Sequence, residues 1–276
     1  MAAMGHTAKL TVCIPCFNEE RYIGEAIESV FRQDYRDFVI LVVDDGSTDG
    51  TLKALKRYAD PRVAIHRNRE NLGLYQNLNR CLALSNTPYI KILCADDVLA
   101  PKCLEEQVAV LERFPGVSLV FGSSEVVDSV GRRLVTRRFS NRSQRIQGRR
   151  LVRTILSSAR NPIGEPSGTM FRRSVIEARR SHFRVEKFQH MADLDFWIQL
   201  LEHGDGYSID KTLFSFRIHK SAGTTKLLKR SISEHQLLQA EYAERHPMNR
   251  FESLFVQAKS VGYFLGKLAF IRLFAR

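Results

Sequence analysis

The chain has 276 residues, of which 44% are hydrophobic and 26% charged, with 16 glycines and 8 prolines. These values are typical of globular proteins and exclude disordered, collagen-like and disulfide-stapled chains. Lysines and arginines number 42 against 30 carboxylates, and the resulting net charge of +12 favours anionic partners.

Strand and helix patterns alternate through the first half of the chain. Apolar side chains recur with helical spacing at Ile23, Ile27 and Val30, between two apolar, β-prone runs. Strands are predicted at 10–14, 38–43, 63–66, 89–94 and 118–121, and helices at 23–31, 51–59, 74–84 and 101–114. This alternation indicates an α/β protein with a mostly parallel sheet and helices on both faces.

The second half of the chain has a looser pattern. We predict a turn at 128–131, helices at 150–158 and 193–202, and strands at 168–172 and 213–219. From residue 229 onward, two helical segments are separated by His246 and Pro247. We expect one continuous domain over 1–225, with halves of about 9–125 and 126–225, followed by a helical extension at 226–276.

The excess positive charge is concentrated in one segment. Between Asp128 and Glu165 there is neither a carboxylate nor a lysine, but there are ten arginines, at positions 132, 133, 137, 138, 142, 145, 149, 150, 153 and 160. Guanidinium groups bind phosphates in a bidentate manner, so a diphosphate-bearing substrate and an anionic membrane surface are candidate partners. A solvated basic loop without a partner is the alternative. No nucleic-acid-binding motif accompanies the segment, and we expect no nucleic-acid partner.

The C-terminal tail, residues 254–276, is rich in apolar side chains with four interspersed cations. A basic amphipathic helix can lie on a membrane surface, which would make the protein a peripheral membrane protein. The four cations do not share one helical face, so packing against the catalytic body or in a homodimer is the alternative.

Cysteine usage and hydropathy indicate a cytoplasmic protein. Five cysteines without a repeated pairing predict reduced thiols, and we interpret Cys13 and Cys16 as buried because no second pair completes a zinc site. The longest apolar run, Phe38–Val43, is too short to cross a bilayer. Residues 1–10 lack the apolar stretch of a secretory signal.

Two pairs of aspartates follow predicted strands, where ligands of parallel sheets bind. Asp44 and Asp45 can accept hydrogen bonds from a nucleobase or ribose, although we expect one of them to cap the following turn. Asp96 and Asp97 would raise each other's pKa unless a cation compensated their charge. Mn²⁺ or Mg²⁺ prefers carboxylates together with phosphate oxygens, so we predict a metal–diphosphate site here; helix capping by Asp97 is the alternative. Neither G-x-x-x-x-G-K-[ST] nor, after the first strand, G-x-G-x-x-G is present to bind phosphate.

Together these segments resemble a known family. The nucleotide-sugar half of family 2 glycosyltransferases is similar, in order and spacing, to Ile14–Glu19 (IPCFNE), Val43–Asp49 (VDDGSTD), Asn71–Gly73 (NLG) and Ala95–Asp97 (ADD). The acceptor half is similar to Asn161–Ser167 (NPIGEPS), Ala192–Trp197 (ADLDFW) and Phe216–His219 (FRIH). The resemblance covers about residues 9–222 and is specific as a set.

The resemblance implies a GT-A fold and inverting transfer of a sugar from a nucleoside diphosphate donor, with uridine as the default base. It implies that Asp97 binds a divalent metal, that His219 approaches the metal and diphosphate, and that Asp96 contacts ribose or sugar. A histidine packed in the core is the alternative for His219. By the same resemblance the nucleoside is held by Pro15, Asn18, Glu20, Asp45, Asn71 and Gly73.

Asp193 matches the aspartate that acts as general base in the family. Inversion needs a carboxylate that removes the acceptor's hydroxyl proton on the face opposite the leaving diphosphate. Asp195 is the rival, and N-capping of the helix is the alternative for either residue. Where the family often has a glutamate before this aspartate, the chain has Ala192.

We therefore predict a metal-dependent hexosyltransferase that transfers a sugar from a nucleotide sugar to a saccharide or lipid-linked acceptor in cell-surface polysaccharide synthesis. A nucleotidyltransferase is one alternative, although the segment after the first strand is not the Gly-rich, basic loop such enzymes use. A non-catalytic protein that binds nucleotide sugars or polyanions is the other.

Overall fold

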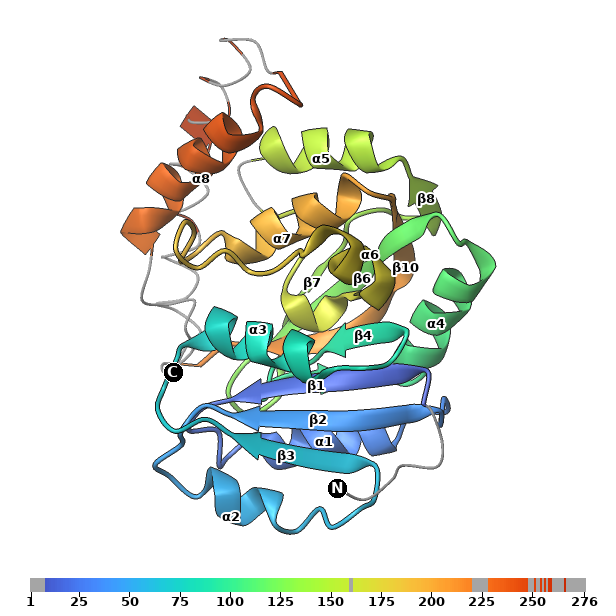
Figure 1. Ribbon diagram of the computed structural model, residues 1–276, viewed down its shortest axis with the longest axis vertical. Helices are drawn as coiled ribbons and strands as arrows, with labels where there is room; N and C mark the ends of the chain where they lie inside the picture. Colours follow the sequence, from blue (N-terminus) through green and yellow to red (C-terminus); the bar gives the residue numbers. More distant parts are fainter. Residues whose placement is uncertain are drawn as a thin grey trace.

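The computed structural model describes residues 8–158, 161–219 and 228–247, together with positions 251, 254, 256, 258, 259 and 266. One sheet runs through the molecule with helices on both of its faces (Figure 1). This arrangement confirms the α/β class expected from the sequence.

The first half of the sheet consists of parallel strands in the order β3-β2-β1-β4. Its strands are β1 (Leu10–Cys16), β2 (Phe38–Asp44), β3 (Val63–Arg67) and β4 (Tyr89–Ile92). They are connected by helices α1 (Ile23–Phe31), α2 (Thr51–Leu55) and α3 (Leu74–Leu84). Because these strands are parallel, the segments that follow them meet at one edge of the sheet.

The second half extends the same sheet in the order β4-β9-β6-β10-β5. Strand β9 is antiparallel to both neighbours, β6 and β10 are parallel, and β7 and β8 pair with β6 and β10. The elements of this half are β5 (Val98–Leu99), α4 (Cys103–Arg113), β6 (Val117–Val127), β7 (Arg133–Arg137), β8 (Gln144–Ile146), α5 (Gly148–Leu156), the 3-10 helix η1 (Pro166–Gly168), β9 (Met170–Arg172), α6 (Arg173–Arg179), α7 (Ala192–Leu201), β10 (Asp205–Arg217) and α8 (Leu228–Tyr242).

Strands β6 and β10 are much longer than the strands predicted at 118–121 and 213–219. The sequence prediction ended the first of them at Phe121, but the chain stays extended through Gly122, where β10 packs closely against it. A Cβ atom on Gly122 would lie 2.5 Å from Leu213 Cδ1. Helix α2 ends at Leu55 instead of Ala59, α4 begins after Lys102 (φ 63°), and α6 has no counterpart among the predicted elements.

Two apolar cores lie on the two faces of the sheet. One core contains the inward faces of α1 and α4 with alternate residues of β1, and the other contains α3, α5 and α7. Aromatic rings of Phe171, Phe183, Phe196 and Trp197 form the centre of the second core. Leu238 and Tyr242 are buried in this same core, so α8 packs against the body formed by the sheet and its helices.

Among the described helices none is both long and apolar enough to cross a bilayer. Most of the second helical segment predicted after Pro247, and most of the tail at 254–276, lie outside the described residues; the six positions described there are helical.

Candidate functional site

The segment after β1 shapes the turn after β2. Asn18 adopts a left-handed φ of 56° and its Oδ1 accepts hydrogen bonds from the amides of Thr48 and Asp49, at 2.8 and 3.3 Å. Glu20 Oε2 accepts a bond from the Gly50 amide at 2.8 Å. Pro15, which was also predicted to hold the nucleoside, is buried in β1 opposite Val43 of β2. The structure therefore brings Pro15, Asn18 and Glu20 to the carboxyl edge beside the aspartate pair.

The two aspartates after β2 have different roles. Asp44 is fully buried, and its Oδ2 accepts a bond from the Ser47 amide at 3.2 Å, which confirms that one member of the pair caps the turn. Asp45 is also buried, and its carboxylate accepts bonds from Asn68 Nδ2 and from the amides of Leu72 and Gly73, at 2.8, 3.0 and 2.9 Å. Asp45 thus fixes the loop after β3.

The loop after β3 contains Asn71 and Gly73, both predicted at the nucleoside site. Gly73 has a φ of 85°, a conformation that disfavours side chains with a Cβ, and its amide donates to Asn71 Oδ1 at 3.0 Å. Three large apolar side chains are exposed at this edge: Phe17 and Leu72 on the loops, and Leu74 at the start of α3. The edge therefore offers apolar surface beside hydrogen-bonding groups.

Asp97, which follows β4, is a buried carboxylate with an unsatisfied oxygen. Its Oδ1 accepts a bond from the Arg217 amide at 3.0 Å, while Oδ2 has no hydrogen-bond partner among the described residues. Burial, and next the charge of Asp96, raise the pKa of Asp97 well above the ordinary aspartate value. Helix α4 has Lys102 at its N-cap, so Asp97 does not cap it.

Asp96, His219 and Glu19 converge beside Asp97. His219 Nε2 lies 3.0 Å from Asp96 Oδ2, and its ring packs on Tyr22 at 5.0 Å between centroids. Ligand atoms of Glu19, Asp96 and His219 lie within 4.8 Å of one another, as do those of Cys94, Asp96 and Asp97. Burial, and next Asp96, raise the pKa of Glu19 to about 8.

The donor set at this cluster fits a divalent cation. Carboxylate oxygens with one imidazole nitrogen suit Mn²⁺ or Mg²⁺, and the Oδ2 atom of Asp97, which has no hydrogen-bond partner among the described residues, offers a further oxygen. The Arg217 guanidinium is buried nearby, but it donates to Glu25 Oε2 at 2.6 Å and to the Asp96 carbonyl at 2.9 Å. Sequence reasoning did not select Glu19, although it lies in the motif after β1.

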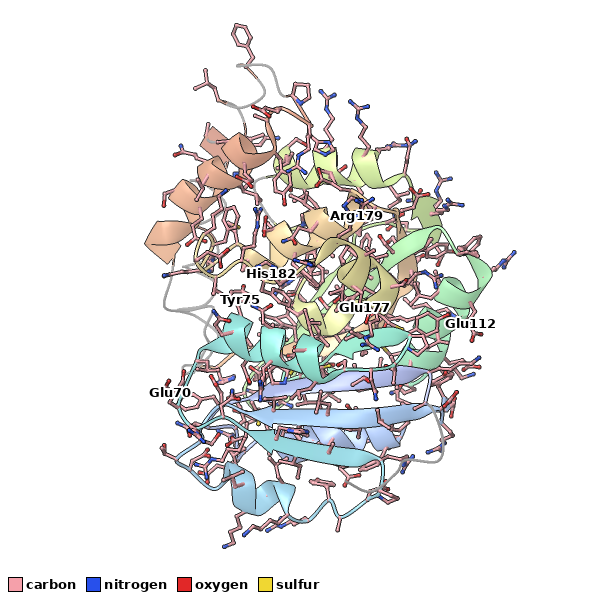
Figure 2. The ribbon with its side chains drawn as sticks, in the orientation of Figure 1. Glu70, Tyr75, Glu112, Glu177, Arg179 and His182 are labelled. Atoms are coloured by element: carbon pink, nitrogen blue, oxygen red, sulfur yellow. The ribbon has the colours of Figure 1, made fainter. Side chains whose placement is uncertain are left out.

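Asp193 lies in the first turn of α7, whose N-cap is Met191, so Asp193 is not the N-cap. Its Oδ1 accepts a bond from the Leu194 amide at 2.8 Å, and its Oδ2 accepts one from Asn161 Nδ2 at 2.9 Å. Tyr75 of α3 faces the segment before α7 (Figure 2), and burial, followed by the charge of Asp193, raises the pKa of Tyr75.

Asp195, the rival of Asp193, has a structural role. It is fully buried, and its carboxylate accepts bonds from Arg184 Nε, Gln199 Nε2 and the Tyr242 hydroxyl, each at 2.8 Å. A carboxylate satisfied by a guanidinium, an amide and a phenol inside the core is not available to an acceptor hydroxyl. Of the two carboxylates, Asp193 therefore stays the candidate for a base.

The bridging loop, residues 161–168, connects Asp193 with the acidic cluster. At one end Asn161 donates to Asp193, and at the other the Cys94 amide donates to Ser167 Oγ at 2.8 Å. The ammonium group of Lys91, fully buried in β4, donates to the Ser167 carbonyl at 2.5 Å. The motif at 161–167 therefore links the first turn of α7 to the segment that follows β4.

Several arginines of the arginine-rich segment form ion pairs, and several others do not. Arg132, Arg133, Arg137 and Arg145 form ion pairs with Asp128, Glu125, Glu165 and Asp205. No ion pair within the described residues involves four exposed arginines, Arg138, Arg142, Arg149 and Arg150, and Arg160 lies outside those residues. Nitrogen-tipped side chains project from α5 into solvent (Figure 2).

Known proteins resemble the chain in sequence and in fold. The model of glycosyl transferase family 2 matches residues 11–180. The putative glycosyltransferase EpsE of Bacillus subtilis is 32% identical over 225 residues, covering 78% of this chain and 74% of EpsE. WfgD of Escherichia coli, a UDP-Glc:alpha-D-GlcNAc-diphosphoundecaprenol beta-1,3-glucosyltransferase, is 27% identical over 120 residues, 44% of this chain and 47% of WfgD.

The fold has a counterpart among solved structures. The crystal structure of S. aureus TarS 1–349 in complex with UDP-GlcNAc matches with a TM-score of 0.71 at 18% identity, covering 92% of this chain and 71% of that one. This similarity confirms the GT-A fold. The family model covers more than half of the chain's length, and the chain therefore belongs to glycosyl transferase family 2.

Proposed function

We propose that the protein transfers a sugar, with inversion, from a uridine diphosphate sugar to a hydroxyl group of a saccharide or lipid-linked acceptor. The observation that carries this proposal is the bridging loop, which ties Asp193 to the segment of Asp96 and Asp97 through Asn161 and Ser167. A base and a diphosphate site held by one loop suit a displacement in which the nucleophile and the leaving group lie on opposite faces of one sugar.

In this proposal the nucleoside lies at the edge formed by the loops after β1, β2 and β3. The exposed Phe17, Leu72 and Leu74 suit the planar face of a base. Asn18 and Glu20 shape one side of that edge, and Asp45 shapes the other through the loop of Asn71 and Gly73, with Pro15 buried beneath. Uridine as the base is supported by WfgD, whose donor is a UDP-sugar.

The diphosphate belongs beside the acidic cluster. Asp97 and His219, with Asp96 and Glu19, would hold a divalent cation, which supplies positive charge to the leaving diphosphate. Asp193 accepts the proton of the acceptor hydroxyl group while the oxygen of that hydroxyl group forms a bond to the anomeric carbon. The bond from that carbon to the diphosphate breaks at the same time, and its electron pair leaves on the diphosphate oxygen. Asn161 and the Leu194 amide orient the Asp193 carboxylate for this transfer.

We expect UDP and Mn²⁺ together to raise the melting temperature more than either alone, because a ligand that binds only the folded state stabilises it by about 2.7 kcal/mol at 100 times its Kd. Differential scanning fluorimetry with UDP, GDP and their sugars tests this. A UDP-sugar that stabilises the protein and is consumed with UDP release excludes a purely binding role. UDP-sugar synthesis from UTP and a sugar 1-phosphate would instead show a nucleotidyltransferase, and the absence of any nucleotide effect would contradict the proposal.

We further propose that the acceptor is attached to a lipid diphosphate at the cytoplasmic face of a membrane. The exposed arginines on and before α5 are suited to anionic headgroups and diphosphates. WfgD, which acts on a diphosphoundecaprenol-linked acceptor, is a relative with such chemistry. Because Arg132, Arg133 and Arg137 are engaged in ion pairs, the proposal applies to the unpaired side chains.

Replacing Arg142, Arg149 and Arg150 by glutamine should weaken binding to vesicles of phosphatidylglycerol by about 100-fold, since each cation near an anionic surface contributes about 1 kcal/mol. Vesicle co-sedimentation measures this, with phosphatidylcholine vesicles as the neutral reference. The matched control removes three exposed cations near α2, at the opposite end of the molecule from α5 (Figure 1): Lys53, Lys56 and Arg57. If both variants lost vesicle binding to the same extent, the loss would reflect net charge alone, which would contradict a specific membrane-binding face at α5.

A further inference from the structure

Glu234 of α8 binds the segment that immediately precedes α7. Its Oε1 accepts a hydrogen bond from the Gln189 amide at 3.1 Å, and its Oε2 accepts bonds from the amides of His190 and Met191 at 2.7 and 3.0 Å. The Glu234 side chain is buried, so these bonds are made in a low-dielectric environment. One carboxylate therefore satisfies three consecutive backbone donors.

The position of this carboxylate also suits the electrostatics of α7. Met191 is the N-cap of α7 and provides no side-chain cap. A negative charge beside the N-terminus of a helix is favourable because it complements the helix dipole. Glu234 thus supplies, from another helix, the charge that a capping side chain would ordinarily provide.

The segment before α7 is also contacted from the nucleotide half of the molecule. The Tyr75 hydroxyl of α3 donates to the His190 carbonyl at 3.4 Å. Residues 189–191 are therefore held between α8 and α3. Asp193 follows two residues later, inside the first turn of α7, so the position of its carboxylate depends on how this segment is held.

A second set of contacts fixes α8 against α7 about two turns further along α8. The Tyr242 hydroxyl donates to Asp195 Oδ1 at 2.8 Å, and Arg184 pairs with both Asp195 and Glu241. Leu238 is buried between them in the core. Helix α8 is therefore anchored independently of Glu234, so loss of the Glu234 carboxylate alone should leave the helix in place.

We infer that Glu234 is a positioning residue for Asp193 and that α8, which belongs to the C-terminal extension, is part of the catalytic site. This inference rests on the proposed function, in which Asp193 is the base. Glu234 has no contact with the acceptor; it fixes the backbone from which the base projects. A displacement of about 1 Å in such a group can lower turnover by about 100-fold.

The test replaces Glu234 by glutamine, which keeps the shape but presents an amide NH₂ to one of the three backbone donors. We expect kcat for UDP release from UDP-GlcNAc, or from the UDP-sugar that the wild type consumes fastest, to fall by about 10- to 100-fold, with KM and the Kd of UDP unchanged. Amide hydrogen exchange at 189–191 should become faster. Glu244→Gln is the matched control, because Glu244 is exposed just after α8 and should leave all four quantities unchanged.

A double-mutant cycle with Asp193→Asn separates positioning from a general loss of structure. If Glu234 acts through Asp193, Glu234→Gln has little further effect on the residual rate of Asp193→Asn; additive losses would overturn the inference. Normal turnover in Glu234→Gln beside an impaired Asp193→Asn would also overturn it. Normal turnover in Asp193→Asn would instead refute the base assignment. Should Glu234→Gln fail to fold, Glu234→Asp keeps the charge, ends one methylene short, and must show the same selective loss of kcat.

Discussion

Replacing Asp193 by asparagine is expected to lower the turnover of sugar transfer by about 100- to 10,000-fold, the range that general base catalysis ordinarily contributes. The asparagine side chain has the same shape, but its amide does not take up the proton of the acceptor hydroxyl. UDP binding, measured by calorimetry with Mn²⁺, should be unchanged, because Asp193 contacts Asn161 and Leu194 and the proposal assigns it to the acceptor side.

Two further variants identify the origin of any loss. Asp195→Asn weakens the ion pair with Arg184 in the core, so it should destabilise the fold by a few kcal/mol, since broken buried pairs cost about 3–5 kcal/mol. Asp34→Asn removes an exposed carboxylate and should change neither activity nor stability. If Asp193→Asn behaved like Asp34→Asn, the proposed base would be wrong. If it behaved like Asp195→Asn, with loss of stability and UDP binding, its role would be structural.

The sequence predicted the first half of the fold well because local pattern determines it. Short, apolar, β-prone runs form β1 and β2, and the stripe at Ile23, Ile27 and Val30 forms the buried face of α1. Since parallel strands end at a common edge, the predicted positions of Asp45 and Asp97 followed from chain order alone. In the second half, the long pairing of β6 with β10 depends on Gly122 admitting Leu213, a contact between residues distant in the sequence.

The candidate site was predicted in its position but not in all its contacts. Asp45 was expected to meet a nucleoside, and the structure shows its carboxylate bound to backbone amides of the loop that it shapes. Glu19 and Glu234 were not selected, because a single glutamate has no local signature. The proposed role of Glu19 depends on its proximity to Asp96, and that of Glu234 on its hydrogen bond with the His190 amide; both partners are distant in the sequence. The distinction between Asp193 and Asp195 likewise required Arg184 and Tyr242.

Burial of Asp97 has opposite consequences for the free and the ligand-bound protein. Its pKa is raised in the folded state, whereas in the unfolded chain it has the ordinary aspartate value near 3.8. Above that pH the folded protein binds more protons at this site than the unfolded chain does. Stability contributed by this group is therefore present at low pH and is lost as pH rises. Burial of the ionised Asp97 carboxylate thus opposes folding at neutral pH.

Asp97→Asn should accordingly raise the melting temperature of the ligand-free protein by a few degrees at pH 8, and by less as pH falls toward 4, because asparagine carries no charge to desolvate. The additional stabilisation by Mn²⁺ with UDP should disappear, and the affinity for Mn²⁺ in the presence of UDP should fall by at least about 10-fold. Scanning fluorimetry with and without Mn²⁺ and UDP measures both effects, and Asp34→Asn, which removes an exposed charge, should show neither.

The Asp97→Asn variant is informative because it should raise the stability of the ligand-free protein but lower its stabilisation by Mn²⁺ and UDP. A residue that only supports the fold would lose stability on substitution, whether or not ligands were present, because the bond from the Arg217 amide to Asp97 would weaken. If Asp97 is instead a ligand of the cation, its substitution should raise the stability of the ligand-free protein and abolish the stabilisation by the cation. Both effects have one cause, since the negative charge that burial disfavours is the charge that the cation requires. A less stable variant that still responds to Mn²⁺ and UDP would therefore place the cation away from Asp97, and with it the diphosphate.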